Sequence, residues 1–245
     1  MNFSGFSDTQ LDMLSKEHSQ WNVQQIRYGK SQIPIIIIDN FSKHAHDLIQ
    51  DSKAQKFQRY GPYYPGVQAH APADYLEPTR TALTYLLTEA FNYQTPKSQL
   101  EMCMYSYVTT RPDSLTPLQR YPHYDGGHPH KIALLHYLCD ASHGGTRFYR
   151  HDRTGFETIA PERRSEYIAS REDDIEEHGL RDAAYFTNTE HGFTCLEKVE
   201  ARFNRAVLYP SSTLHSGEIG PSPHYTTTPE AGRLTVNTFF VPEQT

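Results

Sequence analysis

The stretch KIALLHYLC, residues 131–139, is a short apolar and aromatic run with the length and composition of a buried β-strand. It is one of six such runs between residues 101 and 241, and clusters of Gly, Pro and Asn separate them. The other five are Glu101–Thr109, Thr146–His151, Phe193–Val199, Arg205–Tyr209 and Arg233–Val241. Several short strands with turn signals between them predict an all-β barrel or sandwich over this part of the chain.

The first hundred residues show a different pattern, in which helical and extended segments alternate. The predicted segments are a weak helix over Asp8–Ser19, a buried strand over Gln32–Asp39, a helix from a Ser42 N-cap to about Phe57, and a helix over Thr79–Asn92. Residues 59–78 are rich in Gly and Pro, which predicts a long loop. This part of the chain therefore reads as support for the β-rich part.

One helical segment interrupts the β-rich part. Pro161–His178 is charged and helix-prone, with Pro161 suited to the first helical position and Gly179 to the C-terminal cap. It predicts an insertion near residues 152–190. A length of 245 residues fits one domain. We therefore expect a single domain over 1–245, with 1–98 supporting a β core at 99–241.

The composition excludes several classes of function. Lys+Arg 23 against Asp+Glu 29 gives a net charge of −6, which argues against an electrostatic nucleic-acid binder. No apolar run approaches the roughly 20 residues of a membrane span, and no signal peptide is visible. The three scattered cysteines form neither a disulfide framework nor a CxxC zinc motif. The expected compartment is the cytoplasm, and no pattern predicts an oligomeric state.

The most specific chemical signal is His123-Tyr-Asp125, followed by two glycines. In an extended chain, residues two apart point to the same face, so the imidazole and the carboxylate can bind one metal ion. His215, which follows a strand and a Pro-Ser-Ser turn, is the candidate for a third ligand. Two histidines and one carboxylate form the facial triad of non-haem Fe(II) sites. Zinc is the chemical competitor, but the chain has no H-E-x-x-H motif.

A second candidate group lies on the last predicted strand. Arg233, Thr235 and Asn237 alternate along it, so they share one face. A strand face with these three residues either contacts solvent or lines a polar pocket, where Arg would bind a carboxylate through its planar fork. On the strand alone, the solvent-facing interpretation is favoured.

Taken together, these segments resemble the Fe(II)/2-oxoglutarate-dependent oxygenases, in particular the prolyl-hydroxylase-like branch and a bacterial subgroup of it. No single motif is specific, but the order of the whole set is. The matching segments are Ile35–Phe41, His123-x-Asp125, Tyr137-Leu138 followed by Gly144-Gly145-Thr146-Arg147-Phe148, Asn204–Pro210 with His215, and Arg233-x-Thr235. The resemblance covers roughly residues 33–241.

The resemblance implies a mainly β fold with flanking helices, namely a double-stranded β-helix (a cupin-like jelly roll). It implies Fe(II) held by His123, Asp125 and His215, with 2-oxoglutarate as cosubstrate and O₂ as the oxidant. Arg233 would bind the far carboxylate of 2-oxoglutarate, helped by Thr235 and Tyr137. The expected reaction is hydroxylation of a C–H bond with release of succinate and CO₂. The expected partner is a small-molecule, amino-acid or peptide substrate, with no nucleic acid and no membrane.

Two alternatives stay open from the sequence. The spacing of 18 residues between His215 and Arg233 is long for this branch, and His224 lies between them as a second candidate ligand. We prefer His215, because it adjoins a strand-like segment. The function could also be that of a cupin-like metalloprotein that does not use 2-oxoglutarate, or of a non-catalytic jelly-roll binding module.

Overall fold

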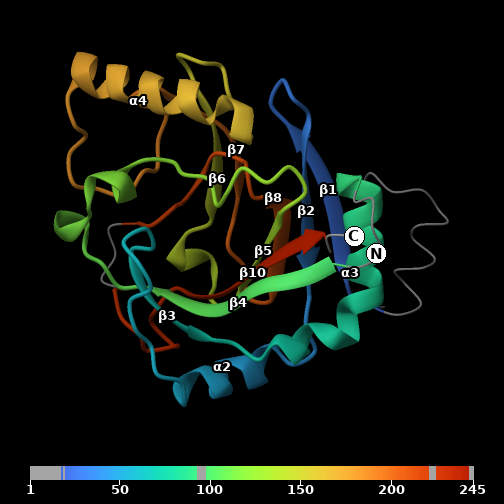
Figure 1. Cartoon of the computed structure of the whole chain (residues 1–245). Coiled ribbons are helices and arrows are strands. Elements are labelled where there is room, and N and C mark those ends of the chain that lie inside the picture. Colours follow the sequence, from blue (N-terminus) through green and yellow to red (C-terminus); the bar gives the residue numbers. More distant parts are fainter. Residues whose placement is uncertain (1–17, 19, 93–97, 221–224, 243–245) are drawn as a thin grey trace.

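The computed structural model describes residues 18, 20–92, 98–220 and 225–242 (Figure 1). The strands are β1 Asn22–Tyr28, β2 Ile33–Asp39, β3 Gly66–His70, β4 Ser98–Val108, β5 Ile132–Tyr137, β6 Thr146–His151, β7 Phe193–Val199, β8 Arg205–Pro210, β9 His215–Gly217 and β10 Leu234–Pro242. The α-helices are α2 Ala45–Lys53, α3 Arg80–Phe91 and α4 Arg164–His178. Short 3₁₀ helices are η1 Ala73–Thr79, η2 Pro112–Ser114, η3 Pro117–Arg120, η4 Ala141–His143 and η5 Pro161–Arg163.

The strands form two sheets. The large sheet has the order β1-β2-β8-β5-β10-β4-β3 and the small sheet the order β7-β6-β9, with every pair antiparallel. Most neighbours in the large sheet are far apart along the chain, as between β10 and β5. The protein is therefore mainly antiparallel β with a few helices, as the sequence predicts.

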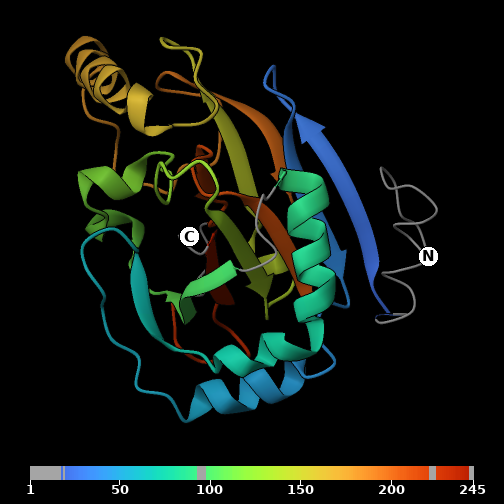
Figure 2. The ribbon, with the colours of Figure 1, turned by 45° about the vertical axis from the view of Figure 1, so that its right-hand side comes forward.

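The apolar residues divide into layers because strand side chains alternate between the two faces. In β2, Ile36 and Ile38 pack with α3 on the outer face of the large sheet. Ile35 and Ile37 pack with Phe148 of the small sheet, in the layer between the sheets. This explains the continuous isoleucine run, which both faces of a buried strand require. Figure 2 shows α3 lying across the large sheet.

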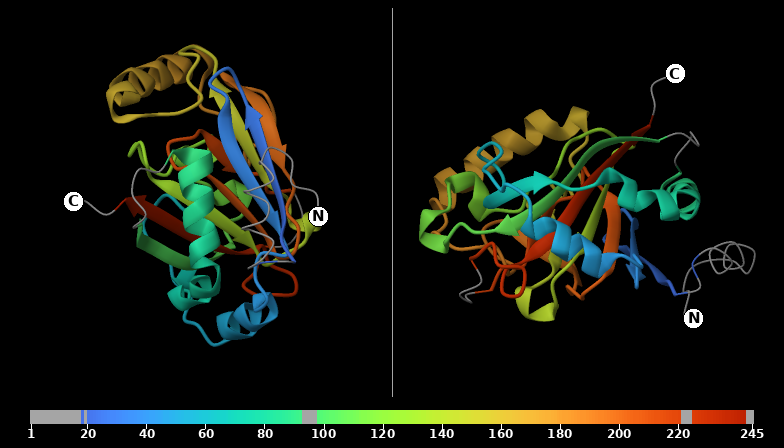
Figure 3. Two further views of the ribbon diagram at one scale, coloured as in Figure 1. Left: turned by 90° about the vertical axis from the view of Figure 1, so that its right-hand side faces the viewer. Right: turned by 90° about the horizontal axis from the view of Figure 1, so that it is seen from below.

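The predicted helical insertion is confirmed, and its position is specific. α4 ends at Gly179, which has a φ of +78°, a conformation that favours glycine. Tyr167 of α4 packs in an aromatic cluster with Tyr149 and Phe193 on the outer face of the small sheet. Figures 1 and 3 show α4 at the end of the molecule remote from α2. The insertion thus covers the outer face of the small sheet, which points away from the large sheet.

The six predicted strands of the β-rich part, the strand over β2 and the helix over α3 are all present. The predicted loop at 59–78 is wrong, because it contains β3 and η1. Gly66 permits β3 to pair there, since a Cβ at this residue would lie 1.9 Å from the Tyr107 carbonyl oxygen.

Two further differences concern strands that the pattern misses and the start of a helix, and one expected helix is not tested. β1 and β9 are not predicted by the sequence pattern, because β1 is polar at most positions and β9 is only three residues long. The helix α2 is shorter than expected and begins after His44, although the Ser42 hydroxyl accepts a hydrogen bond from the His44 N–H. The weak helix expected over Asp8–Ser19 lies outside the described residues, apart from His18. Within the described part, no helix combines the length and apolar character that crossing a membrane requires.

Candidate metal centre

His123 and His215 lie directly opposite each other on neighbouring extended segments. The His123 N–H donates to the His215 carbonyl at 2.8 Å, and the His215 N–H donates to the His123 carbonyl at 2.8 Å. This reciprocal pair holds the two imidazole rings with centroids 4.4 Å apart. Residues far apart in the sequence are therefore fixed at one point by backbone hydrogen bonds.

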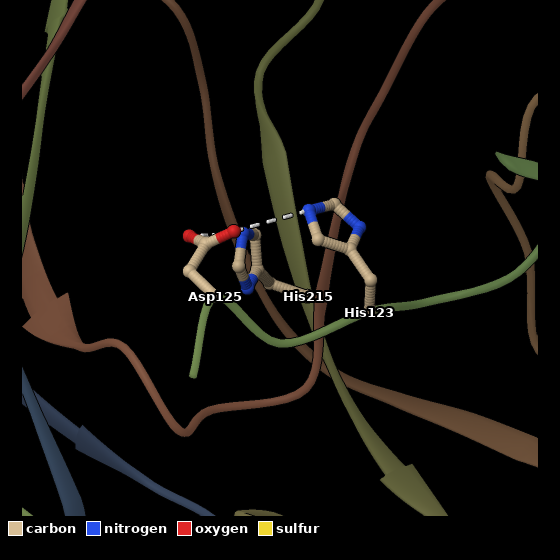
Figure 4. A group of neighbouring side chains, drawn as sticks. All are labelled: His123, Asp125 and His215. Atoms are coloured by element: carbon tan, nitrogen blue, oxygen red, sulfur yellow. Dashed lines mark ion pairs between the residues drawn. The ribbon is translucent and has the colours of Figure 1, made fainter. Parts of the chain in front are cut away.

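Asp125 completes the group (Figure 4). Its Oδ1 lies 3.6 Å from His123 Nε2, and its Oδ2 lies 3.4 Å from His215 Nε2. One ligand atom from each residue lies within 4.8 Å of the others. Tyr124, which lies between His123 and Asp125 in the sequence, points to the opposite side. Its ring packs edge-on against Tyr167 of α4, with the ring centroids 6.1 Å apart. The alternation expected for H-x-D thus places both ligand candidates on one side.

Backbone contacts fix the loop that carries Asp125. The Asp125 N–H donates to the Ser211 carbonyl at 2.8 Å. Gly127 follows, and a Cβ there would come within 3.1 Å of the Ile159 carbonyl oxygen. A side chain at this residue would crowd that contact, so glycine suits the close approach.

His215 is held in one orientation and one tautomer. Its side chain is buried, and its Nδ1 lies 2.9 Å from the Thr213 carbonyl, which can only accept a hydrogen bond. Nδ1 therefore carries the proton in the neutral ring, and the lone pair is on Nε2, which faces Asp125. This is the arrangement that metal-binding histidines usually have.

His123 is neutral at physiological pH. The surrounding protein and the neighbouring His215 ring lower its pKa to about 4, against the opposing effect of Asp125. Solvent still reaches 55% of its side chain, so the ring stands at the open side of the group. A neutral imidazole is the form that binds a metal ion.

These residues fit a divalent metal ion. Two imidazole nitrogens and one carboxylate converge, and in the described part of the chain no Lys or Arg nitrogen lies within 4.0 Å of the Asp125 carboxylate. Two histidines and one carboxylate leave further coordination positions open, which suits Fe(II). No other group of three His, Cys, Asp or Glu side chains in the described residues has this geometry.

Arg233 is buried, so the solvent-facing interpretation is wrong. Its side chain reaches into the protein just before β10, and 6% of the residue is exposed. One guanidinium nitrogen donates to the Gly145 carbonyl at 3.1 Å, and the group lies 5.4 Å from the Tyr137 ring centre. Its Nε has no partner, and within the described residues no carboxylate lies within 4.0 Å. A buried guanidinium in this state can bind an anion.

The other residues expected beside Arg233 lie on the same inner face. Thr235 and Tyr137 are opposite each other in the pairing of β10 with β5. The Tyr137 hydroxyl is 2.6 Å from the Thr146 hydroxyl, and the Thr235 hydroxyl donates to Asn237 at 3.1 Å. Asn237 in turn donates to Ser106 at 3.2 Å. Hydroxyl and amide groups therefore follow Arg233 along this face of the sheet.

Several other residues are outside this group. The Tyr105 hydroxyl donates to Asp51 of α2 at 3.0 Å, on the outer face of the large sheet. Arg120 donates to the carbonyls of Leu115 and Arg181, so it holds loops together. His224 lies outside the described residues.

Tyr209 is a site residue that the sequence pattern did not single out. Its hydroxyl lies 3.3 Å from His215 Nε2. Burial and the nearby Asp125 carboxylate raise its pKa well above the usual value, so the hydroxyl keeps its proton. Tyr209 lies two residues after Val207 on β8, so the two side chains point to the same, inner face of the strand. This periodicity could have identified Tyr209 as a residue on the side where the metal ligands are expected.

Solved structures share this fold. HygX from Streptomyces hygroscopicus, with nickel and 2-oxoglutarate bound, superimposes with a TM-score of 0.51 and 12% identity, covering 98% of this chain and 88% of that chain. SnoN, a non-haem α-ketoglutarate-dependent epimerase from nogalamycin biosynthesis, gives a TM-score of 0.52 and 12% identity, covering 96% and 84%. The comparison therefore shows that the chain shares the fold of these two proteins.

The family of the chain is shown by its sequence. Residues 19–240 match the model of a family of unknown function (DUF6445), and the chain belongs to this family. No curated protein sequence matches the chain significantly.

Proposed function

We propose that the protein is an Fe(II)- and 2-oxoglutarate-dependent oxygenase. The observation that carries the proposal is a His-Asp-His group together with a buried guanidinium, that of Arg233, for which the described residues provide no carboxylate partner. The shared fold with HygX and SnoN supports the proposal. HygX is known with nickel and 2-oxoglutarate bound, and SnoN is an α-ketoglutarate-dependent epimerase. The two sheets then form a jelly roll, residues 99–241 are its core, and the whole chain is one domain.

The metal would be held by His123, Asp125 and His215. Bound Fe(II) would activate O₂ for oxidation of a substrate C–H bond, with 2-oxoglutarate supplying the other electrons and leaving as succinate and CO₂. The chain lowers the pKa of His123 and fixes the orientation of the His215 ring through Nδ1, and no Lys or Arg of the described residues pairs with the Asp125 carboxylate. The presence of Asp125 favours hydroxylation over chemistry that needs an extra anion on the metal.

The far carboxylate of 2-oxoglutarate would bind Arg233. Gly217 is two residues beyond His215 on β9, which is about 7 Å along a strand, and a Cβ on Gly217 would lie 3.9 Å from the guanidinium. A short dicarboxylate bridges such a separation, with one end at the metal and the other at Arg233. Tyr137 and Thr235 would contribute hydroxyl groups beside that carboxylate.

The substrate would be a small molecule, an amino acid or a peptide. The small sheet is covered from behind by α4, so this helix is a scaffold element and the substrate approaches from the solvent-exposed side of His123. Neither the net charge nor the site points to a nucleic-acid substrate.

The test is anaerobic titration of the protein with Fe(II) and then 2-oxoglutarate, monitored by the visible charge-transfer absorption of the chelated metal. We expect the band in the wild type and its loss in His215→Ala. Arg233→Gln should raise the 2-oxoglutarate concentration needed by about 100-fold, because a buried charge pair loses one partner. Arg150→Gln, which removes a guanidinium paired with Asp152 near the C-terminal end of β6, is the control and should leave the titration unchanged.

Metal binding without any band in the wild type would reject the role of 2-oxoglutarate and favour a cupin-like metalloprotein. Absence of metal binding would leave a jelly-roll binding module. Succinate release with candidate substrates is the subsequent assay for hydroxylation.

A further inference from the structure

The Tyr209 hydroxyl occupies an unusual place next to the candidate metal centre. It lies 3.3 Å from His215 Nε2, and no other hydrogen-bond partner for it is found among the described residues. The Tyr209 ring is fixed by edge-on contacts with Phe148 at 5.2 Å and with His215 at 5.0 Å. The residue is 3% exposed, so water does not readily replace this partner.

The direction of this hydrogen bond follows from the His215 tautomer. Since Nδ1 donates to the Thr213 carbonyl, the neutral ring has only a lone pair at Nε2. Tyr209 must therefore be the donor and Nε2 the acceptor. The same lone pair is the one that a metal ion facing Asp125 would use.

A metal ion and the Tyr209 hydroxyl therefore compete for one lone pair. When the metal takes it, the hydroxyl loses its acceptor inside the protein. A buried hydroxyl without a partner costs about 1–3 kcal/mol. An oxygen atom bound to the metal is the nearest replacement, because the hydroxyl is at most about 5.4 Å from a metal placed about 2.1 Å from Nε2.

We propose that Tyr209 couples the binding of metal and cosubstrate, by releasing His215 Nε2 to the metal and donating instead to a metal-bound carboxylate oxygen of 2-oxoglutarate. This inference rests on the proposed function. Tyr209 opposes binding of the bare metal and favours binding of the metal together with an oxo acid. Because such coupling is reciprocal, the oxo acid also tightens metal binding.

The test uses the metal-free protein, Ni(II), which does not turn over, and 2-oxoglutarate, with both affinities measured by isothermal titration calorimetry. Tyr209→Phe keeps the ring and removes the hydroxyl. It should bind Ni(II) alone about 2- to 10-fold more tightly, since the competing hydrogen bond is gone. The Ni(II)-loaded variant should bind 2-oxoglutarate about 10-fold more weakly. A purely structural role would not move these two affinities in opposite directions.

Tyr149→Phe is the matched control, because the Tyr149 hydroxyl is also buried but faces the aromatic cluster behind the small sheet. It should change neither affinity. Equal affinities of Tyr209→Phe and wild type for both ligands would overturn the coupling role and leave the proposed function intact. Failure of the Ni(II)-loaded wild type to bind 2-oxoglutarate would overturn the proposed function and the coupling, while the Ni(II) affinities would still report the competition for Nε2.

Discussion

Two groups of histidine and aspartate lie on opposite sides of the small sheet, and they are built differently. On the inner side, Asp125 stands 3.4–3.6 Å from the nitrogens of His123 and His215. On the outer side, Asp174 of α4 lies 2.6 Å from His151 Nε2 and 2.7 Å from Arg153 Nε. The first group contains gaps between its polar atoms, whereas the second is closed by direct hydrogen bonds.

The difference lies in how the carboxylate is neutralised. Asp174 also accepts from Arg171 at 3.3 Å, and the Thr154 hydroxyl contacts the other ring nitrogen of His151 at 2.8 Å. Burial raises the pKa of Asp174, but hydrogen bonds from Arg153 and His151 outweigh this, and the net shift is downward. A carboxylate compensated by guanidinium groups needs no metal, so the outer group is structural. The inner carboxylate has charge left for a cation.

The inner group is the most sensitive point for metal binding. His215→Ala should weaken Ni(II) binding by at least about 100-fold, because it removes a ligand and not merely a contact to one. Calorimetric titration of the metal-free protein measures this. His151→Asn is the control, and a comparable loss of Ni(II) affinity in that variant would contradict the division into a metal group and a structural group.

The outer group should control stability. Asp174→Asn should lower the free energy of unfolding by about 3 kcal/mol, because the buried His151 ring and the partly exposed Arg153 and Arg171 lose their shared charged acceptor. Urea unfolding followed by circular dichroism measures the change. The exposed neighbour Asp173 provides the matched variant Asp173→Asn, which should be within about 0.5 kcal/mol of wild type. Unchanged stability of Asp174→Asn would remove the structural role assigned to the outer group.

Acid should weaken the fold through histidines that are buried in the neutral form. Burial lowers the pKa of His136 to about 4, against the effect of its contact with Asn204, while the unfolded chain has the ordinary value near 6.5. Below pH 6.5 the unfolded state therefore binds a proton that the folded state does not. Stability should fall by up to about 1.4 kcal/mol per pH unit, and by about 3 kcal/mol in total by pH 4.

His136 belongs to neither group, so its contribution to the pH dependence of stability serves as a reference for that of the outer group. Burial also lowers the pKa of His151, against the hydrogen bond and charge of Asp174, so the outer group adds to the loss in the same pH range. Chemical unfolding at a series of pH values measures the slope. His136→Asn should reduce the slope by about one proton's contribution, and an unchanged slope would show that other groups dominate.

The smallest expected effect concerns the link between the two groups. The Arg171 guanidinium lies 4.2 Å from the centre of the Tyr121 ring, and Tyr121 precedes the His123–Asp125 segment. Arg171→Met keeps apolar contact but removes the cation–π interaction and the hydrogen bond to Asp174, and should lower stability by about 2 kcal/mol. Thermal unfolding should show a decrease of a few degrees, with Ni(II) affinity within a few-fold of wild type. Loss of Ni(II) binding in this variant would mean that α4 sets the ligand geometry more strongly than the backbone pairing does.

Much of the β framework could be predicted from local sequence. The apolar runs at β5, β6, β8 and β10 are short, are bounded by turn residues and are found where expected. The polar edge strand β1 could not be predicted, because its pairing with β2 supplies what its side chains lack. β3 could not be predicted either, because its segment is rich in Gly and Pro and its extended conformation depends on pairing with β4.

The candidate site was only partly predictable. H-x-D alternation gave the relative orientation of His123 and Asp125, and it holds because their segment is extended. The burial of Arg233 could not be inferred from its strand, because both faces of such a strand can carry polar residues. Tyr209 was missed because its role depends on one hydrogen bond to His215.

The sequence by itself determined the residue types, the local periodicity and the order of segments, because these follow from side-chain chemistry and from the geometry of a single strand. Only the tertiary structure decided which distant atoms meet. The reciprocal backbone hydrogen bonds between His123 and His215 exist because strand register aligns segments far apart in the chain. The fold also brings Arg233 beside Gly145, with no carboxylate of the described residues within reach, while packing of α4 gives Asp174 its guanidinium partners. Identical residue types thus become an open ligand group or a closed structural group according to the neighbours that the fold provides.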